Sequence, residues 1–153
     1  MLQATNIAKR YGSATALHPT TLHLAPGSFT VLLGPSGAGK STLLRCLDLL
    51  SPVSEGSISV RGIGPVNTAG KLRELRRKTG FIFQQHQLIL RETALRNTLN
   101  GRIGFHSLFQ GLLPPSPAEV KKAYACLARV GMEHFALTPA GSLSGGQQQR
   151  VGI

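Results

Sequence analysis

One motif constrains the fold of this chain more than any other feature of its sequence. Residues 34–41 read GPSGAGKS and match the phosphate-binding pattern GxxxxGK(S/T) at every fixed position. The apolar run FTVLL at residues 29–33 precedes this loop and predicts a strand buried on both faces. A helix predicted over residues 40–50 follows the loop, so that strand, loop and helix together indicate an α/β fold. The apolar stripe expected on that helix consists of Leu43, Leu44, Leu47 and Leu50.

The residue types in this loop determine its chemistry. Glycines allow successive backbone N–H groups to converge on one centre, and the start of the following helix adds its positive dipole end. Lys40 is expected to reach the β- and γ-phosphates of a nucleoside triphosphate, and the Ser41 hydroxyl to bind Mg²⁺. The residues predicted to bind the nucleotide here are Gly34, Pro35, Ser36, Gly37, Ala38, Gly39, Lys40, Ser41 and Thr42.

A second candidate anion site lies 104 positions after Lys40. Residues 143–147 read LSGGQ and place the Ser144 hydroxyl and two glycines at the start of a predicted helix. A chain with two phosphate-binding helix ends suggests that one of them serves a second copy of the chain.

These motifs resemble those of the ABC-type ATPases, whose signature is LSGGQ. The resemblance covers nearly the whole chain, because phosphate loop, glutamine loop and signature follow in that family's order and at about its spacing. It implies a P-loop NTPase core of ABC type with an N-terminal antiparallel β part, over residues 1–90, and an α-helical subdomain with the signature, over residues 91–153. It also implies two subunits that dimerise head-to-tail, with ATP between the phosphate loop of one and the signature of the other.

The resemblance also implies roles for individual residues. Gln84, directly after a strand predicted at residues 80–83 (GFIF), matches the glutamine that contacts Mg²⁺ and the attacking water. Tyr11 matches the aromatic residue on which adenine stacks, a contact of about 1–3 kcal/mol. Lys40 and Gln84 are then the catalytic residues, and Ser41 and Gln84 the metal-binding ones. The residues expected to contact the γ-phosphate bound by the opposite subunit are Ser144, Gly145, Gly146 and Gln147.

The subfamily is indicated by three longer segments. The glutamine-loop region, an irregular insertion predicted over residues 102–115 and the stretch before the signature resemble the ATP-binding subunit of phosphonate importers. This implies a peripheral subunit on the cytoplasmic face of the inner membrane. Its expected partners are a second nucleotide-binding subunit, transmembrane permease subunits and, indirectly, a solute-binding protein. Import of another small solute, such as a polar amino acid, stays open. Arg96 departs from the family pattern, which has an acidic residue before Asn97, and Gly152 replaces the usual alanine.

Acidic residues are scarce, which bears on catalysis. The chain has 17 Lys and Arg against 6 Asp and Glu, and its single aspartate, Asp48, lies in the helix after the phosphate loop. The family requires an aspartate at the end of a hydrophobic strand, a glutamate directly after it and a later histidine, which no residue here matches. We therefore expect an N-terminal part of such a subunit that lacks the strands flanking residues 29–33 and does not hydrolyse ATP alone. The alternative is a catalytically inactive nucleotide-binding remnant.

Charge and composition exclude other classes. The basic run KLRELRRK at residues 71–78 predicts a helix, but only 5 % of the chain is aromatic, so we expect no nucleic-acid partner. We interpret this helix as a solvated face near anionic lipid head groups or a membrane partner. The five histidines lack metal-ligand spacing, and the two cysteines are expected to be small apolar fillers of helices.

Local signals predict the remaining elements. Residues 21–24 and 56–60 read as strands. A helix is predicted to start at Ser116, which serves as its N-cap and forms a capping box with Glu119, and Pro117 suits the first helical position. Gly131 is expected to end this helix in a left-handed conformation. Its expected buried face consists of Val120, Ala123, Tyr124, Leu127 and Ala128.

Overall fold

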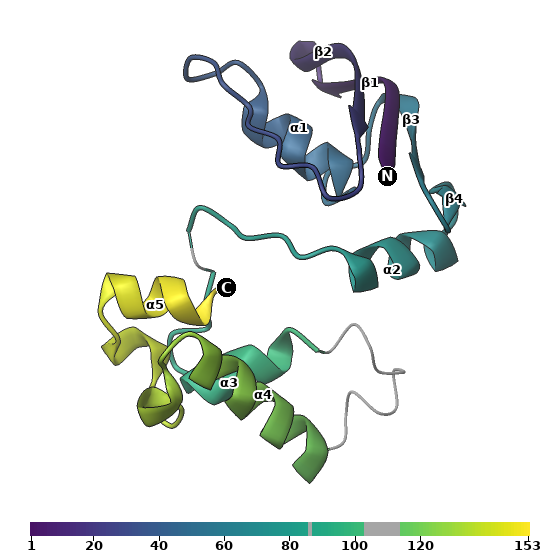
Figure 1. Cartoon of the computed structure of the whole chain (residues 1–153). Coiled ribbons are helices and arrows are strands. Elements are labelled where there is room, and N and C mark those ends of the chain that lie inside the picture. Colours follow the sequence, from purple (N-terminus) through teal and green to yellow (C-terminus); the bar gives the residue numbers. More distant parts are fainter. Residues whose placement is uncertain (86, 103–113) are drawn as a thin grey trace. The chain divides into compact units, whose positions relative to one another are not determined.

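The computed structural model describes residues 1–85, 87–102 and 114–153, which form two compact units, Met1–Gly80 and Phe81–Ile153 (Figure 1). The first unit contains an antiparallel sheet with two helices, and the second is helical. Together they have the α/β composition that the sequence predicts. The division into residues 1–90 and 91–153 stays a prediction.

The sheet of the first unit has four antiparallel strands in the order β2-β1-β3-β4. The long strands β1 (Leu2–Tyr11) and β2 (Ala14–Leu24) form a hairpin in which Tyr11 pairs with Ala14. The turn between them contains Gly12 at a φ of 59°, which glycine adopts without strain. The predicted strand at residues 21–24 is the end of β2, and that at 56–60 is β3 (Glu55–Val60), which precedes the short β4 (Gly64–Pro65).

Helix α1 (Lys40–Leu47) follows the phosphate loop and packs against the sheet. The prediction that it extends to residue 50 is wrong, because Leu49 adopts a left-handed φ of 51° that no α-helix accommodates. The predicted apolar stripe is also partly wrong, since Leu44 is exposed and Cys46 takes a core position instead. The exposed fraction of Leu50 is 39 %. The buried core of this unit consists of Ala4, Ile7, Leu17, Leu43, Cys46, Leu47 and Ile58.

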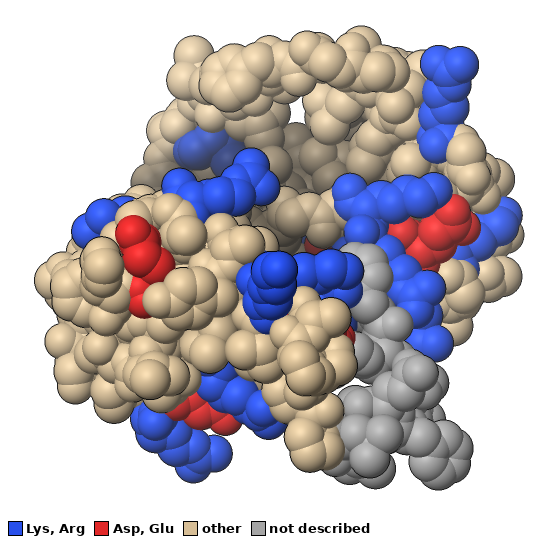
Figure 2. Space-filling model, turned by 60° about the horizontal axis from the view of Figure 1, so that its bottom comes forward, with Lys and Arg blue, Asp and Glu red and all other residues tan. Residues whose placement is uncertain are grey.

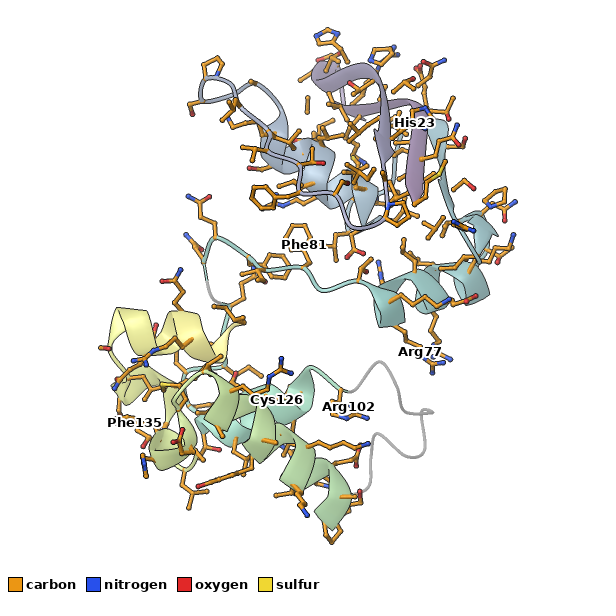
Figure 3. The ribbon with its side chains drawn as sticks, in the orientation of Figure 1. His23, Arg77, Phe81, Arg102, Cys126 and Phe135 are labelled. Atoms are coloured by element: carbon orange, nitrogen blue, oxygen red, sulfur yellow. The ribbon has the colours of Figure 1, made fainter. Side chains whose placement is uncertain are left out.

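The two cysteines occupy different environments. Cys46 is fully buried, as predicted for an apolar filler, and burial raises the pKa of its thiol while the charge of Lys9 acts in the opposite direction. Cys126 lies on the exposed side of a helix in the second unit (Figure 3), so the same prediction is wrong for that residue.

Two predicted strands are not strands in the structure. Residues 29–33 form no ladder, and Phe29 and Leu33 are 93 % and 88 % exposed, whereas Leu32 packs against the core. A strand requires a neighbour for its backbone N–H and C=O groups, and no described segment pairs with residues 29–33. Residues 80–83 also form no ladder; there the rings of Phe81 and Phe83 contact each other, with centroids 4.7 Å apart (Figure 3).

Helix α2 (Ala69–Lys78) confirms the basic helix predicted at residues 71–78. The Thr68 side chain caps its start, and Leu75 is its buried residue. Figure 2 shows more basic than acidic side chains on the face in view, in line with the overall excess of positive charge.

The second unit contains α3 (Ala94–Asn100), α4 (Pro117–Arg129), the short 3-10 helices η3 (Glu133–Phe135) and η4 (Ala140–Ser142), and α5 (Gly145–Val151). Arg102, just after α3 (Figure 3), lies 3.9 Å from Glu119 of α4, measured from Nε to Oε1. The buried residues at the centre are Ala94, Leu127, Met132, Ala136, Leu143 and Val151.

Helix α4 shows which local predictions hold. Its capping box is present, and Gly131 has the predicted left-handed φ of 66°. The predicted buried face is too wide: Ala123 and Leu127 are buried, whereas Tyr124 and Ala128 are exposed and Val120 is half-buried. In a unit of this size each helix packs along a narrow stripe, so the residues next to Ala123 and Leu127 on the helix surface stay in contact with solvent. Of the insertion predicted at residues 102–115, residues 103–113 lie outside the described residues.

Candidate functional site

The backbone of the phosphate loop depends on glycine at defined positions. Gly37 and Gly39 have φ values of 82° and 83°, in the left-handed region that side chains disfavour. A Cβ at Gly39 would lie 2.9 Å from the carbonyl oxygen of Ala16 in β2, closer than such atoms approach. Gly39 thus lets the loop turn tightly into α1 against the sheet.

Helix α1 begins in a manner unlike the other α-helices of the described residues, because its N-cap is Gly39 and no side chain caps it. Its first turn contains no acidic residue, which is also true of α2, α3 and α5. Helices α2, α3, α4 and α5 are each capped by a threonine or serine hydroxyl. The first N–H groups of a helix need an acceptor from outside it, and the positive dipole end favours an anion there. The start of α1 therefore fits a phosphate group.

Lys40 brings a positive charge to the same place. Its Nζ donates hydrogen bonds to the carbonyl oxygens of Gly34 (2.8 Å) and Pro35 (2.7 Å), so that the ammonium group lies over the loop. Ser41 is exposed and Thr42 is half-buried at the start of α1. Amides, an ammonium group and an exposed hydroxyl within one short segment form a donor set suited to a polyphosphate with a magnesium ion.

Tyr11 lies at the end of β1 in the same unit. Its ring is about half exposed, and Lys9 Nζ lies 5.0 Å from the ring centroid, within cation–π range. Its hydroxyl is 3.1 Å from Ser51 Oγ, beyond the end of α1. These contacts hold an accessible aromatic face, although none of them joins Tyr11 to residues 34–41.

The signature forms the start of α5 in the second unit. Ser144 Oγ accepts a hydrogen bond from the Gln147 N–H (3.3 Å), and the Ser144 N–H donates to Gln147 Oε1 (2.8 Å). The two residues thus form a capping box and satisfy each other. A Cβ on Gly145 or Gly146 would meet nothing within 4 Å in the described residues. Packing within this unit therefore does not explain why glycine occupies these positions.

Gln84 is exposed and lies in the second unit, as the signature does. The structure therefore brings the phosphate-loop residues and Tyr11 into one unit, and Gln84 and the signature into the other.

Two side chains to which the sequence assigned no role connect the elements of the second unit. Asn97 makes four hydrogen bonds to the backbone before α3, and Gln148 makes two to the backbone before α5. An asparagine inside a helix, where it has low propensity, was the available signal for Asn97.

The described residues contain neither a metal-binding cluster nor a membrane-spanning helix. Within residues 1–85, 87–102 and 114–153, no group of three or more His, Cys, Asp or Glu side chains could hold a metal ion. No helix there is long and apolar enough to cross a membrane.

A phosphate loop on an α/β core and an LSGGQ helix start define the class of ATP-binding cassettes. The chain belongs to the ABC transporter family, whose model matches residues 17–153. The phosphonates import ATP-binding protein PhnC 1 of Trichodesmium erythraeum is 49 % identical over 154 residues, which cover 100 % of this chain and 61 % of the relative. The phosphite import ATP-binding protein PxtA of Stutzerimonas stutzeri is 50 % identical over 142 residues, which cover 93 % of this chain and 51 % of the relative.

A solved structure shares the fold as well. The dimeric structure of a bacterial ABC transporter cassette superposes with a TM-score of 0.84 at 34 % identity, covering 100 % of this chain and 67 % of that chain. The chain therefore spans between about half and two thirds of the length of the proteins it matches.

Proposed function

We propose that this chain is the ATP-binding, energy-coupling part of an ABC importer for phosphonate or a related phosphorus oxyanion, and that ATP is hydrolysed between two copies arranged head-to-tail. The observation that carries the proposal is the start of α1, which lacks a side-chain cap and has the ammonium group of Lys40 beside it. The relatives named for phosphonate and phosphite import support the solute class. Import of a polar amino acid is the competing assignment.

The phosphate loop holds the triphosphate in this proposal. The N–H groups of residues 37–41 donate to phosphate oxygens, and Lys40 exchanges its bonds to the loop carbonyls for bonds to the β- and γ-phosphates. Ser41 would hold Mg²⁺, and the metal ion when bound would supply positive charge to the phosphates. The family resemblance gives Gln84 a role at the same metal ion. Tyr11 would stack on the adenine ring.

The signature acts on the nucleotide of the second copy. The open space beside Gly145 and Gly146 supports this role, because a phosphate can approach backbone N–H groups closely only where side chains are absent. Ser144 and Gln147 would exchange their mutual hydrogen bonds for bonds to the γ-phosphate. In the importer, the two copies sit on permease subunits at the cytoplasmic face of the inner membrane, and a solute-binding protein delivers the solute.

A second candidate, a subunit that binds nucleotide without hydrolysing it, is favoured by the environment of Asp48. Its Oδ1 accepts a hydrogen bond from the Thr79 hydroxyl, which joins the end of α1 to the end of α2. The single aspartate therefore has a structural partner away from the phosphate loop. If this candidate holds, the chain binds MgATP and releases no phosphate.

Titration calorimetry with MgATP tests the nucleotide site. We expect saturable binding by the wild-type chain and a loss of about 100-fold in affinity for Lys40→Ala, because a charged hydrogen-bonding partner is removed. Lys71→Ala, a lysine of α2 in the same unit, is the control and is expected to bind normally. Equal affinities for all three proteins would contradict the proposal.

Growth on defined phosphorus sources tests the solute. A strain that lacks this gene is expected to lose growth on a phosphonate as the sole phosphorus source and to keep growth on inorganic phosphate. Normal phosphonate growth together with loss of uptake of a polar amino acid would favour the competing assignment.

A further inference from the structure

A single side chain holds the segment that leads from the glutamine loop to α3. The Ile89 N–H donates to Asn97 Oδ1 (2.8 Å), and Asn97 Nδ2 donates back to the Ile89 carbonyl (3.1 Å). The same Nδ2 lies 3.0 Å from the carbonyl of Thr93 and 3.4 Å from that of Glu92. Asn97 is half-buried; its bonds to the Thr93 and Glu92 carbonyls are partly shielded from water, whereas its two bonds to Ile89 are exposed. The segment five to nine residues after Gln84 is thereby fixed to α3.

The segment held by Asn97 is also paired with the backbone that leads into the signature. The Ala140 N–H donates to the Glu92 carbonyl (2.8 Å), and the Gly141 N–H donates to the Leu90 carbonyl (2.9 Å). Thr93, the N-cap of α3, and Pro139 form an antiparallel β-bridge next to these two bonds. A Cβ on Gly141 would lie 3.2 Å from the Leu90 carbonyl oxygen, so the two backbones approach closely.

Gln148 completes the connection to α5. Its Nε2 donates to the carbonyls of Ala140 (3.0 Å) and Leu143 (3.2 Å). One continuous set of hydrogen bonds thus runs from the exit of the glutamine loop through residues 139–141 to α5, the helix that Ser144 caps.

We propose that Asn97 is a positioning residue that makes the exit of the glutamine loop and the signature helix move as one body, so that a change at Gln84 reaches Ser144. The proposal rests on the proposed function, in which Gln84 contacts the metal ion and Ser144 the nucleotide of the second copy. Asn97 itself contacts neither. It acts through the backbone of residues 89–93.

The chemistry at residue 97 requires both a donor and an acceptor. Three carbonyl oxygens face Nδ2 and one N–H faces Oδ1. The two N–H groups of an amide serve the Ile89 and Thr93 carbonyls, with the longer contact to Glu92 sharing one of them, whereas an ionised carboxylate has no donor. In Asn97→Asp, one carboxylate oxygen would still accept a hydrogen bond from the Ile89 N–H, but the other would face carbonyl oxygens. This repulsion between acceptors raises the pKa of the introduced carboxyl. Protonation at low pH would supply one O–H donor and restore part of the contact.

The chain offers a matched control three residues along the same helix. Asn100 is also half-buried, and its Nδ2 donates to the side chain of Glu92 (2.8 Å). Asn100→Ala therefore removes the same chemical group from α3 without releasing the backbone that Asn97 holds.

Amide hydrogen exchange on the 153-residue chain tests the coupling independently of ATP. In Asn97→Ala we expect the Ile89 amide to exchange about tenfold faster, and the Ala140 and Gly141 amides about threefold faster, because the released segment no longer holds them. In Asn100→Ala we expect less than about a twofold change at all three amides. Faster exchange at Ile89 alone, or equal effects of both variants, would overturn the proposal.

Sedimentation with MgATP tests the consequence for function. We expect Asn97→Ala to keep wild-type MgATP affinity by calorimetry and to lose about tenfold in MgATP-dependent self-association, with Asn100→Ala unchanged. As pH is lowered from 7.5 to about 5.5, self-association of Asn97→Asp, expressed relative to wild type at the same pH, is expected to increase. The same ratio for Asn97→Ala is expected to stay constant. A flat pH profile for Asn97→Asp, or wild-type self-association of Asn97→Ala, would overturn the proposal. If the wild-type chain does not self-associate with MgATP, the proposed dimer fails, and the exchange measurement decides on Asn97.

Discussion

The helix starts of α1 and α5 are both assigned to phosphate binding, yet they differ in how their N–H groups are satisfied. At α1 no side chain caps the helix, and Lys40 Nζ donates to two loop carbonyls. At α5 the side chains of Ser144 and Gln147 already form a capping box. A phosphate entering α1 displaces no side-chain cap, whereas one entering α5 must replace two existing hydrogen bonds.

This difference indicates an order of binding. Under the proposed function, the start of α1 would hold ATP alone, while the start of α5 would gain little from a free anion, since its capping box is worth about 1 kcal/mol. A γ-phosphate already held by another copy is delivered at high effective concentration and can replace that box. The glycines at the two helix starts also differ. The packing of the first unit requires glycine at residue 39, whereas the packing of the second unit does not require it at residues 145 and 146.

The largest effect is expected from changing the glycine that the fold requires. Gly39→Ala should destabilise the first unit by about 3 kcal/mol, from a left-handed φ together with a clash against the Ala16 carbonyl. Gly37→Ala has the same φ but open space and should cost only about 1 kcal/mol. Urea unfolding measures both. Equal losses would remove the claim that the approach to β2 fixes the loop.

A signature glycine should respond in the opposite direction. Gly146→Ala lies in a helix with open space around it and should stabilise the second unit by about 0.5 kcal/mol. The added methyl group should at the same time weaken MgATP-dependent self-association about tenfold, because it blocks close approach to the N–H groups. Thermal unfolding and sedimentation separate the two effects. A variant that is less stable and associates normally would reverse our interpretation of these glycines.

The capping serines provide a matched pair. Ser144→Ala and Ser116→Ala each remove a capping-box hydroxyl and should each cost about 1 kcal/mol in urea unfolding. Only Ser144→Ala should also lower MgATP-dependent self-association, because Ser116 begins α4. If both serines affected association alike, helix stability rather than phosphate contact would explain the result.

Local chemistry explains which parts of the fold the sequence predicted. The cap at Ser116 and the stop at Gly131 depend on residues within one helical turn, and both are present. The strand at residues 29–33 depends on a partner, and without one in the described residues Phe29, Val31 and Leu33 lie exposed. The width of the buried face of α4 likewise depends on what packs against it.

The candidate site follows the same rule. Fixed motifs located two helix starts, which the structure contains at α1 and α5, and their contact with phosphate stays a prediction. Asn97 escaped prediction because its four bonds go to backbone groups whose positions only the fold determines.

The smallest expected effect is the pH dependence of stability that the buried thiol of Cys46 gives to the first unit. Because burial raises the pKa of the Cys46 thiol above its ordinary value of 9.0, the unfolded chain loses this proton at lower pH than the folded one. Stability of the first unit should therefore fall as pH rises through and above about 9, and Cys46→Ala should show a shallower fall. Urea unfolding from pH 7 to 10 measures the slope, and a slope unchanged in Cys46→Ala would contradict it. Cys126→Ala, at an exposed position, is the control.

The most direct test of two unlike sites acting across two copies is complementation between damaged chains. Lys40→Ala removes the α1 site and keeps the signature, whereas Gly146→Asp places a negative charge at the signature and keeps the phosphate loop. Sedimentation with MgATP should find neither variant associating alone, while an equimolar mixture forms a heterodimer with one intact composite site. If the mixture stays monomeric while the wild-type chain dimerises, or if either variant dimerises alone, the two helix starts do not share one nucleotide.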